Sequence, residues 1–377
     1  MEYTKKLIGS AVILTVCTLV PLGVNGAWRI MPAVSETVLR TAAAEMGGSK
    51  IAHEKKTPPT LAAAPHIGKT ARDIEAAPEE TETHLPEGTE IPTPLPSREV
   101  LDAVPYPTGL TYGDGAIQKL NYGKYTGEQY FDLDGGGQVR NCTWHTNAEL
   151  YETSRLGRVF DIEPGSPEPQ VLIYHTHTTE SFELEERDSY DSAFYGKTTE
   201  PDKNITAVGD ELCRELEACG ITVIHDTLVH DYPSYDAAYD SSRETVSALL
   251  EEYPSIKIAL DIHRDGIETA DGVRPAPVAS VDGKDAAQIM IISGCDDGTM
   301  NMPDYLNNFR FACELQSETE TMFPGLTRPI LFDYRFYNQD LTDGSLLIEV
   351  GSHGNTLDQA KYTGSLIGQA LGRLLTE

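Results

Sequence analysis

The chain has 377 residues, and its 59 acidic side chains outnumber its 29 lysines and arginines, which gives a formal net charge of −30. This balance argues against a nucleic-acid-binding protein, because affinity for a phosphate backbone depends on Lys and Arg. Apolar residues make up 40% of the chain, which suffices for a folded core if part of the chain lies outside it.

The first 28 residues are predicted to be an export segment. Two lysines precede an apolar stretch over residues 7–28, which is close to the length that spans a bilayer. A cleaved signal peptide is the alternative, because the small residues at 26–27 offer a cleavage site. Under either interpretation the rest of the chain is exported. We expect residues 1–28 to form a single-pass membrane anchor, with the C-terminal part outside the cytoplasm.

Residues 29–107 are predicted to be a linker. Ten of the 23 prolines lie between residues 58 and 107, among many acidic residues, and such a stretch buries too little apolar surface to fold. Residues 108–168 are richer in Gly and Tyr, which suits short strands and turns. We expect a small, irregular N-terminal lobe there.

From residue 169 to residue 377 the pattern alternates between strand and helix. Apolar runs predict strands over residues 171–174, 221–224, 256–262, 288–293 and 346–350. Helical spacing predicts helices over residues 205–219, 246–253 and 306–315. Thr356 and Gln359 predict a capping box that opens a final helix. The pattern predicts an α/β fold, in which helices flank a mostly parallel sheet and ligands bind beyond the carboxyl ends of the strands.

Three groups of polar side chains follow or interrupt these predicted strands. Residues 175–180 (HTHTTE) follow the first strand, residues 261–265 (DIHRD) end the third, and Glu349 lies inside the otherwise apolar last strand. A carboxylate in an apolar strand is costly unless another group engages it. We expect the three groups to lie at one rim of the sheet.

These side chains predict a zinc site. A catalytic zinc keeps three protein ligands and one water, and His177, Glu180 and His263 supply such a set, with His175 as a further candidate ligand. Glu349 then fits the role of a base that takes a proton from water. The alternative is structural, since a lone His at a strand end is usually an ordinary core or surface residue and Glu349 would then be a salt-bridge partner.

Arg264 is the other predicted catalytic residue. It follows His263 directly, so it could bind a substrate carboxylate or steady an oxyanion, or it could equally pair with Asp261 or Asp265. His353 is a weaker candidate, which we expect in a loop. The chain contains no Gly-rich phosphate loop and no nucleophile elbow, which argues against nucleotide and serine-hydrolase chemistry.

Five blocks of sequence resemble the stage II sporulation protein P family. They are residues 171–182 (VLIYHTHTTESF), 261–265 (DIHRD), 323–329 (FPGLTRP), 337–341 (YNQDL) and 347–351 (LIEVG). The resemblance covers about residues 110–377, and an N-terminal anchor with a variable linker also suits this family.

The resemblance implies an extracytoplasmic peptidoglycan hydrolase that acts in engulfment of the forespore. Its implied activity is that of a zinc-dependent N-acetylmuramoyl-L-alanine amidase, with an added endopeptidase activity. The implied partners are stage II sporulation proteins D and M, and residues 169–377 would be the catalytic domain.

This domain is in turn similar to the wider zinc-dependent muramoyl-alanine amidases. Carried over from them, the first His ligand is His175 or His177, the second is His263, and the catalytic Glu is Glu349. We favour His177 because it lies further past the end of the strand. The glycines that flank the first His in those amidases are missing here.

The Glu ligand has two candidates. In the wider amidases it lies just before the first helix, which corresponds to Glu200 in this chain. Glu180 lies inside a matched block and has ligand spacing from His177, so we favour Glu180.

Two other functions are alternatives to the amidase. A zinc carboxypeptidase would use the same ligands, and it would need a basic clamp for a terminal carboxylate, for which Arg264 and Arg328 are the obvious candidates. A wall-binding scaffold with a degenerate site belongs to another class, and the short tandem repeats that would favour it are missing from the sequence.

Overall fold

The computed structural model describes residues 103–377. The predicted anchor at 1–28 and most of the predicted linker at 29–107 lie outside the described residues. The chain divides into two units, Met1–Ala77 and Pro78–Glu377, and all described residues belong to the second. Among the helices of residues 103–377, none is long and apolar enough to cross a membrane.

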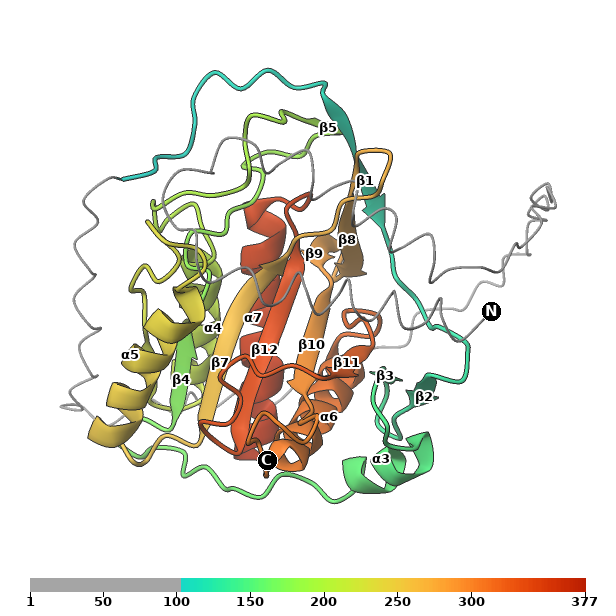
Figure 1. The fold of residues 1–377 in the computed structure, drawn as a ribbon, viewed down its shortest axis with the longest axis vertical. Coiled ribbons are helices and arrows are strands. Elements are labelled where there is room, and N and C mark those ends of the chain that lie inside the picture. The colour runs from blue at the N-terminus through green and yellow to red at the C-terminus, as the bar shows by residue number, and fades with distance from the viewer. Residues whose placement is uncertain (1–102) are drawn as a thin grey trace, which may run out of the picture. The chain divides into compact units, whose positions relative to one another are not determined.

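Eight strands form a large sheet (Figure 1). They are β2 (Tyr130–Asp132), β3 (Gln138–Asn141), β4 (Val171–Tyr174), β6 (Val223–His225), β7 (Ile258–Asp265), β10 (Ile289–Gly294), β11 (Ile330–Asp333) and β12 (Gly344–Ser352). Their order across the sheet is β2-β3-β11-β10-β12-β7-β4-β6.

The predicted α/β class is confirmed, but the sheet is mixed. Strands β6, β4, β7 and β12 run parallel to one another. Strand β10 runs antiparallel to β12 and parallel to β11, and β2 runs antiparallel to β3. The direction of β10 follows from its connection, because two strands rather than a crossover helix lead to it from β7.

Those two connecting strands belong to a second, smaller sheet. It contains β1 (Gly115–Leu120), β5 (Ser189–Tyr190), β8 (Val273–Val281) and β9 (Lys284–Ala287), in the order β5-β1-β8-β9. Residues 108–168, which were expected to form a small lobe, contribute β1 to this sheet, β2 and β3 to the edge of the large sheet, and helix α3 (Asn147–Ser154).

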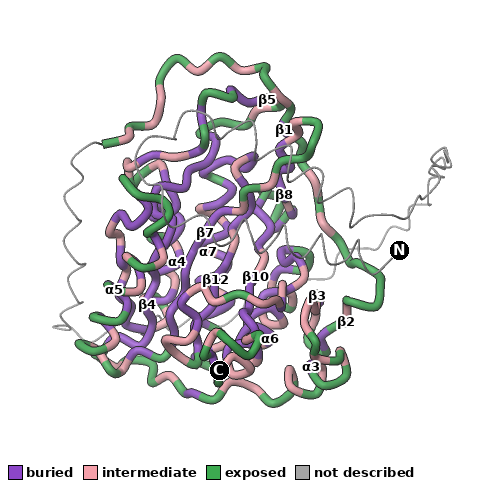
Figure 2. The backbone as a smooth tube through the Cα atoms, viewed as in Figure 1, coloured by how far each residue is buried: buried purple, intermediate pink, exposed green. Residues whose placement is uncertain are grey.

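Helices cover both faces of the large sheet. They are α4 (Thr206–Ala218), α5 (Ala238–Glu252), α6 (Tyr305–Met322) and α7 (Leu357–Thr376). Ile173 of β4 and Leu260 of β7 pack in the core cluster that α4, α6 and α7 share. Leu172 and Ala259, which point the opposite way, pack with Val246 of α5. Figure 2 shows the central strands buried between these layers.

Candidate active site

The predicted site residues lie at the carboxyl ends of β4 and β7 and on β12. His177 and Glu180 belong to the buried loop that follows β4, and His263 lies near the end of β7. Glu349 is the register partner of His263 across β12 and β7. Because paired residues on neighbouring strands point to the same face, His263 and Glu349 project from one face of the sheet, which we call the site face.

The two histidines lie next to each other. The ring centroids of His177 and His263 are 5.3 Å apart, with the ring planes nearly perpendicular. The Nδ1 atom of His177 is buried without a hydrogen-bond partner and lies 3.9 Å from Asp231 Oδ2. Burial and the neighbouring His263 lower the pKa of His177, so its ring is neutral near neutral pH.

Two carboxylates flank His263. Its Nδ1 lies 3.8 Å from Glu180 Oε2, and its Nε2 lies 2.7 Å from Asp261 Oδ1, although without the alignment of a hydrogen bond. Asp261 is held in turn by Thr176, whose backbone N–H and hydroxyl donate to it at 2.8 and 2.6 Å. Burial works against the charged ring, but Asp261 and then Glu180 and Glu349 raise the pKa of His263 to about 9.

Glu349 has a buried and unpartnered carboxyl oxygen. Its Oε2 makes no hydrogen bond within residues 103–377. Burial raises the pKa of Glu349 to about 8, against the opposing charge of His263. A carboxylate that is poised near neutral pH and aimed at the same place as His263 is suited to general acid–base work.

The donor types fit a zinc ion. Imidazole and carboxylate are preferred zinc ligands, and the unpartnered, buried Nδ1 of His177 and Oε2 of Glu349 are atoms that a bound ion and its water would engage. Over the described part of the chain, however, no group of three or more His, Cys, Asp or Glu side chains is arranged so that it could already hold a metal ion.

The structure places two of the alternative ligands elsewhere. Both ring nitrogens of His175 have protein partners, since Nδ1 lies 2.9 Å from the carbonyl oxygen of Ile262 and Nε2 lies 2.8 Å from His225 Nε2. Glu200 forms an ion pair with Lys203. Of the candidates, His177, Glu180, His263 and Glu349 are the ones that the fold brings together.

Arg264 is directed away from this group. It follows His263 on β7, so its side chain projects to the opposite face, where the guanidinium donates to the carbonyl oxygens of Gly196 and Asp265 at 3.1 and 3.3 Å. Its backbone N–H donates to Glu180 Oε2 at 2.9 Å. The contact of this residue with the site is therefore through its main chain, which fixes the carboxylate of Glu180.

Two residues of the loop before α5 also lie at the site, and neither was predicted. Asp231 is buried and accepts hydrogen bonds from Thr179 N and Oγ1 at 3.0 and 2.6 Å. The Tyr235 ring stacks on His177 at 4.4 Å, and Lys197 Nζ lies 4.0 Å from the Tyr235 centroid. These residues precede α5 in an irregular loop, where neither helical nor strand spacing gives a signal.

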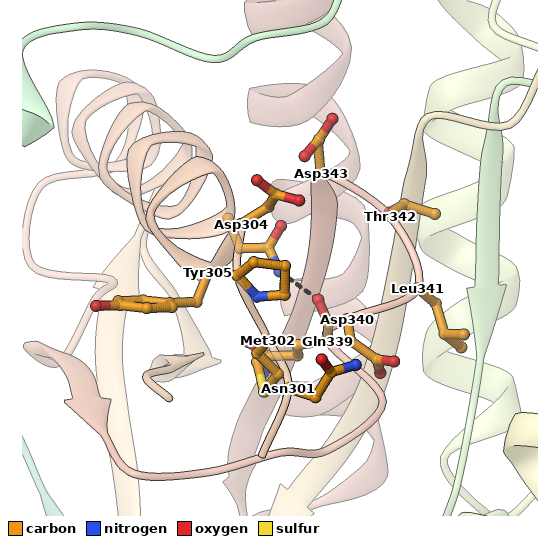
Figure 3. A pocket seen from close by; sticks show the side chains of 11 residues that line it. Asn301, Met302, Asp304, Tyr305, Gln339, Asp340, Leu341, Thr342 and Asp343 are labelled. Carbon is orange, nitrogen blue, oxygen red and sulfur yellow. Dashed lines mark hydrogen bonds between the residues drawn. The ribbon is translucent and has the colours of Figure 1, made fainter. Parts of the chain in front are cut away.

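A further cavity of about 400 Å³ lies at the other end of β12. Figure 3 shows its walls, which include Gln339 and Asp340. Asn308 Nδ2 donates to the carbonyl oxygen of Gln339. Its lining includes residues 339–343, which lead into the first residue of β12, whereas Glu349 lies near the last. None of the predicted site residues lines it, so it is not part of the candidate site.

Comparisons with known proteins agree on a family. The model of the stage II sporulation protein P family matches residues 134–372. Stage II sporulation protein P of Bacillus subtilis (strain 168) is 32% identical over 202 residues, which cover 50% of this chain. The match covers 47% of that protein, so the chain spans about half the length of this curated relative.

Several solved amidase structures are also similar. The CwlD amidase from Clostridioides difficile, in complex with the GerS lipoprotein, is 13% identical with a TM-score of 0.33, over 55% of this chain and 95% of that one. The N-acetylmuramoyl-L-alanine amidase AmiC2 of Nostoc punctiforme is 12% identical with a TM-score of 0.32, over 55% of this chain and 94% of that one.

Proposed function

Because the chain belongs to the stage II sporulation protein P family, we propose that it is a peptidoglycan hydrolase of sporulation. The bond that it cleaves is the amide between N-acetylmuramic acid and the L-alanine of the stem peptide. The observation that carries this proposal is the pairing of Glu349 with His263 on the site face, with a buried, unpartnered carboxyl oxygen and a raised pKa.

The proposed cofactor is zinc, held by His177, Glu180 and His263. A zinc ion bound there would lower the pKa of a water molecule and polarise the scissile carbonyl. Asp261 supplies a negative charge 2.7 Å from Nε2 of His263. The main-chain N–H of Arg264 fixes Glu180. The stacked ring of Tyr235 limits the rotation of His177.

Glu349 performs the proton transfers in this proposal. Its carboxylate takes the proton of the attacking water and returns it to the departing amine of L-alanine. Burial raises the pKa of Glu349, which makes its carboxylate a stronger base toward the water proton, and the protonated carboxyl can then donate to the amine.

Substitution of Glu349 tests this assignment. In Glu349→Gln the fold and the metal content are retained, and turnover of purified sacculi falls by a factor of roughly 10²–10⁴. Glu183→Gln is a matched control, because Glu183 also has a buried, unpartnered Oε2 and a pKa raised by burial. We expect the Glu183→Gln variant to keep its activity. Full activity in Glu349→Gln would remove Glu349 from the mechanism.

The remaining parts of the proposal rest on family membership. The protein is anchored by residues 1–28, and its C-terminal domain lies outside the cytoplasm. It acts in engulfment with stage II sporulation proteins D and M, and it carries an endopeptidase activity beside that of the amidase. Co-purification of each partner from sporulating cells with the full chain tests these contacts, and failure with both would remove them.

A further inference from the structure

The site face continues past Glu349 as a row of partly exposed side chains. Across β12 and β10, Glu349 pairs with Met290, and across β11 and β3, Leu331 pairs with Arg140. All four are half-buried or exposed, whereas the residues beside them on each strand point to the core on the other face. The row therefore leads from the proposed base across the sheet to the edge formed by β2 and β3.

A pocket of about 310 Å³ lies over this row. Met290, Leu331 and Pro329 form an apolar part of its lining, and Tyr122, Tyr125 and Tyr130 form an aromatic part. The pocket also includes Asp265 and Arg328, two residues whose charges act on the carboxyl of Glu349. The pocket therefore neighbours the candidate active site, because Met290 in its lining is the register partner of Glu349.

The aromatic wall is held in place by buried side-chain amides. Gln288 accepts from Tyr122 N at 2.7 Å and donates to Tyr122 O at 3.0 Å. Gln138 does the same for Tyr125, at 2.8 and 3.1 Å. The rings of Tyr125 and Tyr130 stack at 5.2 Å. Each glutamine binds both the backbone N–H and the backbone carbonyl of its tyrosine. These bonds hold the loop that forms the aromatic wall in place.

Two arginines supply donors to the pocket. Arg328 is 6% exposed, and its Nη1 binds Asp265 Oδ2 at 2.9 Å, while its Nε and Nη2 have no hydrogen-bond partner among residues 103–377. Arg140 is exposed and forms no ion pair with any described residue. Burial raises the pKa of Tyr125, and the charges of Arg328 and Arg140 oppose this rise.

We propose that this pocket is a subsite for a carboxylate-bearing segment of the stem peptide. Buried arginine donors without partners are costly unless an anion completes them, and arginine matches a carboxylate with two parallel hydrogen bonds. The apolar lining suits an aliphatic chain between that carboxylate and the bond at Glu349. The choice of a stem peptide rests on the proposed function, whereas the preference for a carboxylate rests on the pocket alone.

The test compares two synthetic peptides by isothermal titration calorimetry with the full-length chain. One is L-Ala-γ-D-Glu-L-Lys with its terminal carboxylate blocked as an amide, and the other is its isoglutamine form, in which a carboxamide also replaces the Glu α-carboxylate. The wild type binds the acid about tenfold more tightly than the amide, as expected for a charge-assisted hydrogen-bond pair. Arg140→Gln removes this preference and leaves the affinity for the amide unchanged.

Arg214→Gln is the matched control, because Arg214 is an exposed arginine on α4. We expect this variant to retain the preference for the acid peptide over the amide. Equal affinities for both peptides in the wild type would overturn the subsite. So would a preference that survives in both Arg140→Gln and Arg328→Gln. Two variants are used because Arg328 also binds Asp265, whereas Arg140 does not contribute to the core.

The binding assay needs no turnover, so its outcome is separate from that of the amidase proposal. Digestion of purified sacculi is followed with the same wild-type preparation. Release of stem peptides together with equal binding of the two peptides overturns the subsite and leaves the amidase. A preference for the acid without release of stem peptides supports the subsite and removes the amidase.

Discussion

The surroundings of His353 lower the pKa of its ring. It lies just past β12, and burial together with the charges of Arg264 and Arg274 lowers its pKa to about 3. Its Nε2 is buried without a hydrogen-bond partner within the described range. The ring is therefore kept neutral in the folded protein.

This shift predicts a pH dependence of stability. An unfolded His titrates near ~6.5, so between about pH 6.5 and 3 the unfolded chain binds a proton that the folded chain does not. Stability is then lost as the pH falls through this window and gained as it rises. His353→Gln is expected to flatten the slope of the unfolding free energy against pH by at most about 1.4 kcal/mol per pH unit. Urea unfolding at several pH values measures it, and an unchanged slope contradicts the assignment.

Strand ends in a parallel region meet at one edge of the sheet. For this reason the sequence could predict that four side chains lie close together, namely His177, Glu180, His263 and Glu349. Their roles stay predictions. Asp231 and Tyr235 could not be found in this way, since contacts made by an irregular loop depend on tertiary packing. The side on which Arg264 lies follows from strand alternation, so its separation from His263 could have been read from the sequence.

The elements next to the site were predicted where local signals were strong. The strand at 171–174 has the bounds of β4, and the capping box is confirmed, with Thr356 Oγ1 accepting from Gln359 N at 3.2 Å and Gln359 Oε1 accepting from Thr356 N at 3.2 Å. This box begins α7 directly after the loop that holds His353.

Removal of the cap is expected to weaken the fold but not the chemistry. Thr356→Ala loses the hydroxyl that satisfies an N-terminal N–H of α7, which costs roughly 1 kcal/mol of unfolding free energy. Thr356→Ser keeps the hydroxyl and serves as the control. Chemical denaturation measures both variants. Equal stability of the Ala and Ser variants would show that the box does not stabilise α7.

The β8–β9 hairpin was not predicted, and it explains why the sheet is mixed and not mostly parallel. Asp282 and Gly283 join the two strands, both with positive φ (50° and 74°), and an Asp-Gly pair between alternating residues is a strong hairpin signal. A hairpin in place of a crossover helix returns the chain to the large sheet at the same end where β7 left it. The antiparallel direction of β10 therefore could have been inferred from this dipeptide.

At the scale of the whole molecule, helices and loops divide the sheet into two unequal faces. Helices α4, α6 and α7 pack in the same core cluster, while α5 packs on the site face over β4, β6 and β7. The partly exposed row from Glu349 to Arg140 lies on that same face. A polymer such as peptidoglycan needs an open surface of this kind. The composition of the chain did not indicate that one face of the sheet is open.

The most direct test of the central claim is to digest purified sacculi with the full-length chain and identify the products by mass spectrometry. The digestion is run with bound metal, after chelation, and after zinc is restored. We predict about one zinc per chain and release of intact stem peptides with a free L-alanine amine, lost on chelation and recovered with zinc. Shortened peptides that remain on the glycan, or products that are indifferent to the chelator, would contradict a zinc-dependent amidase.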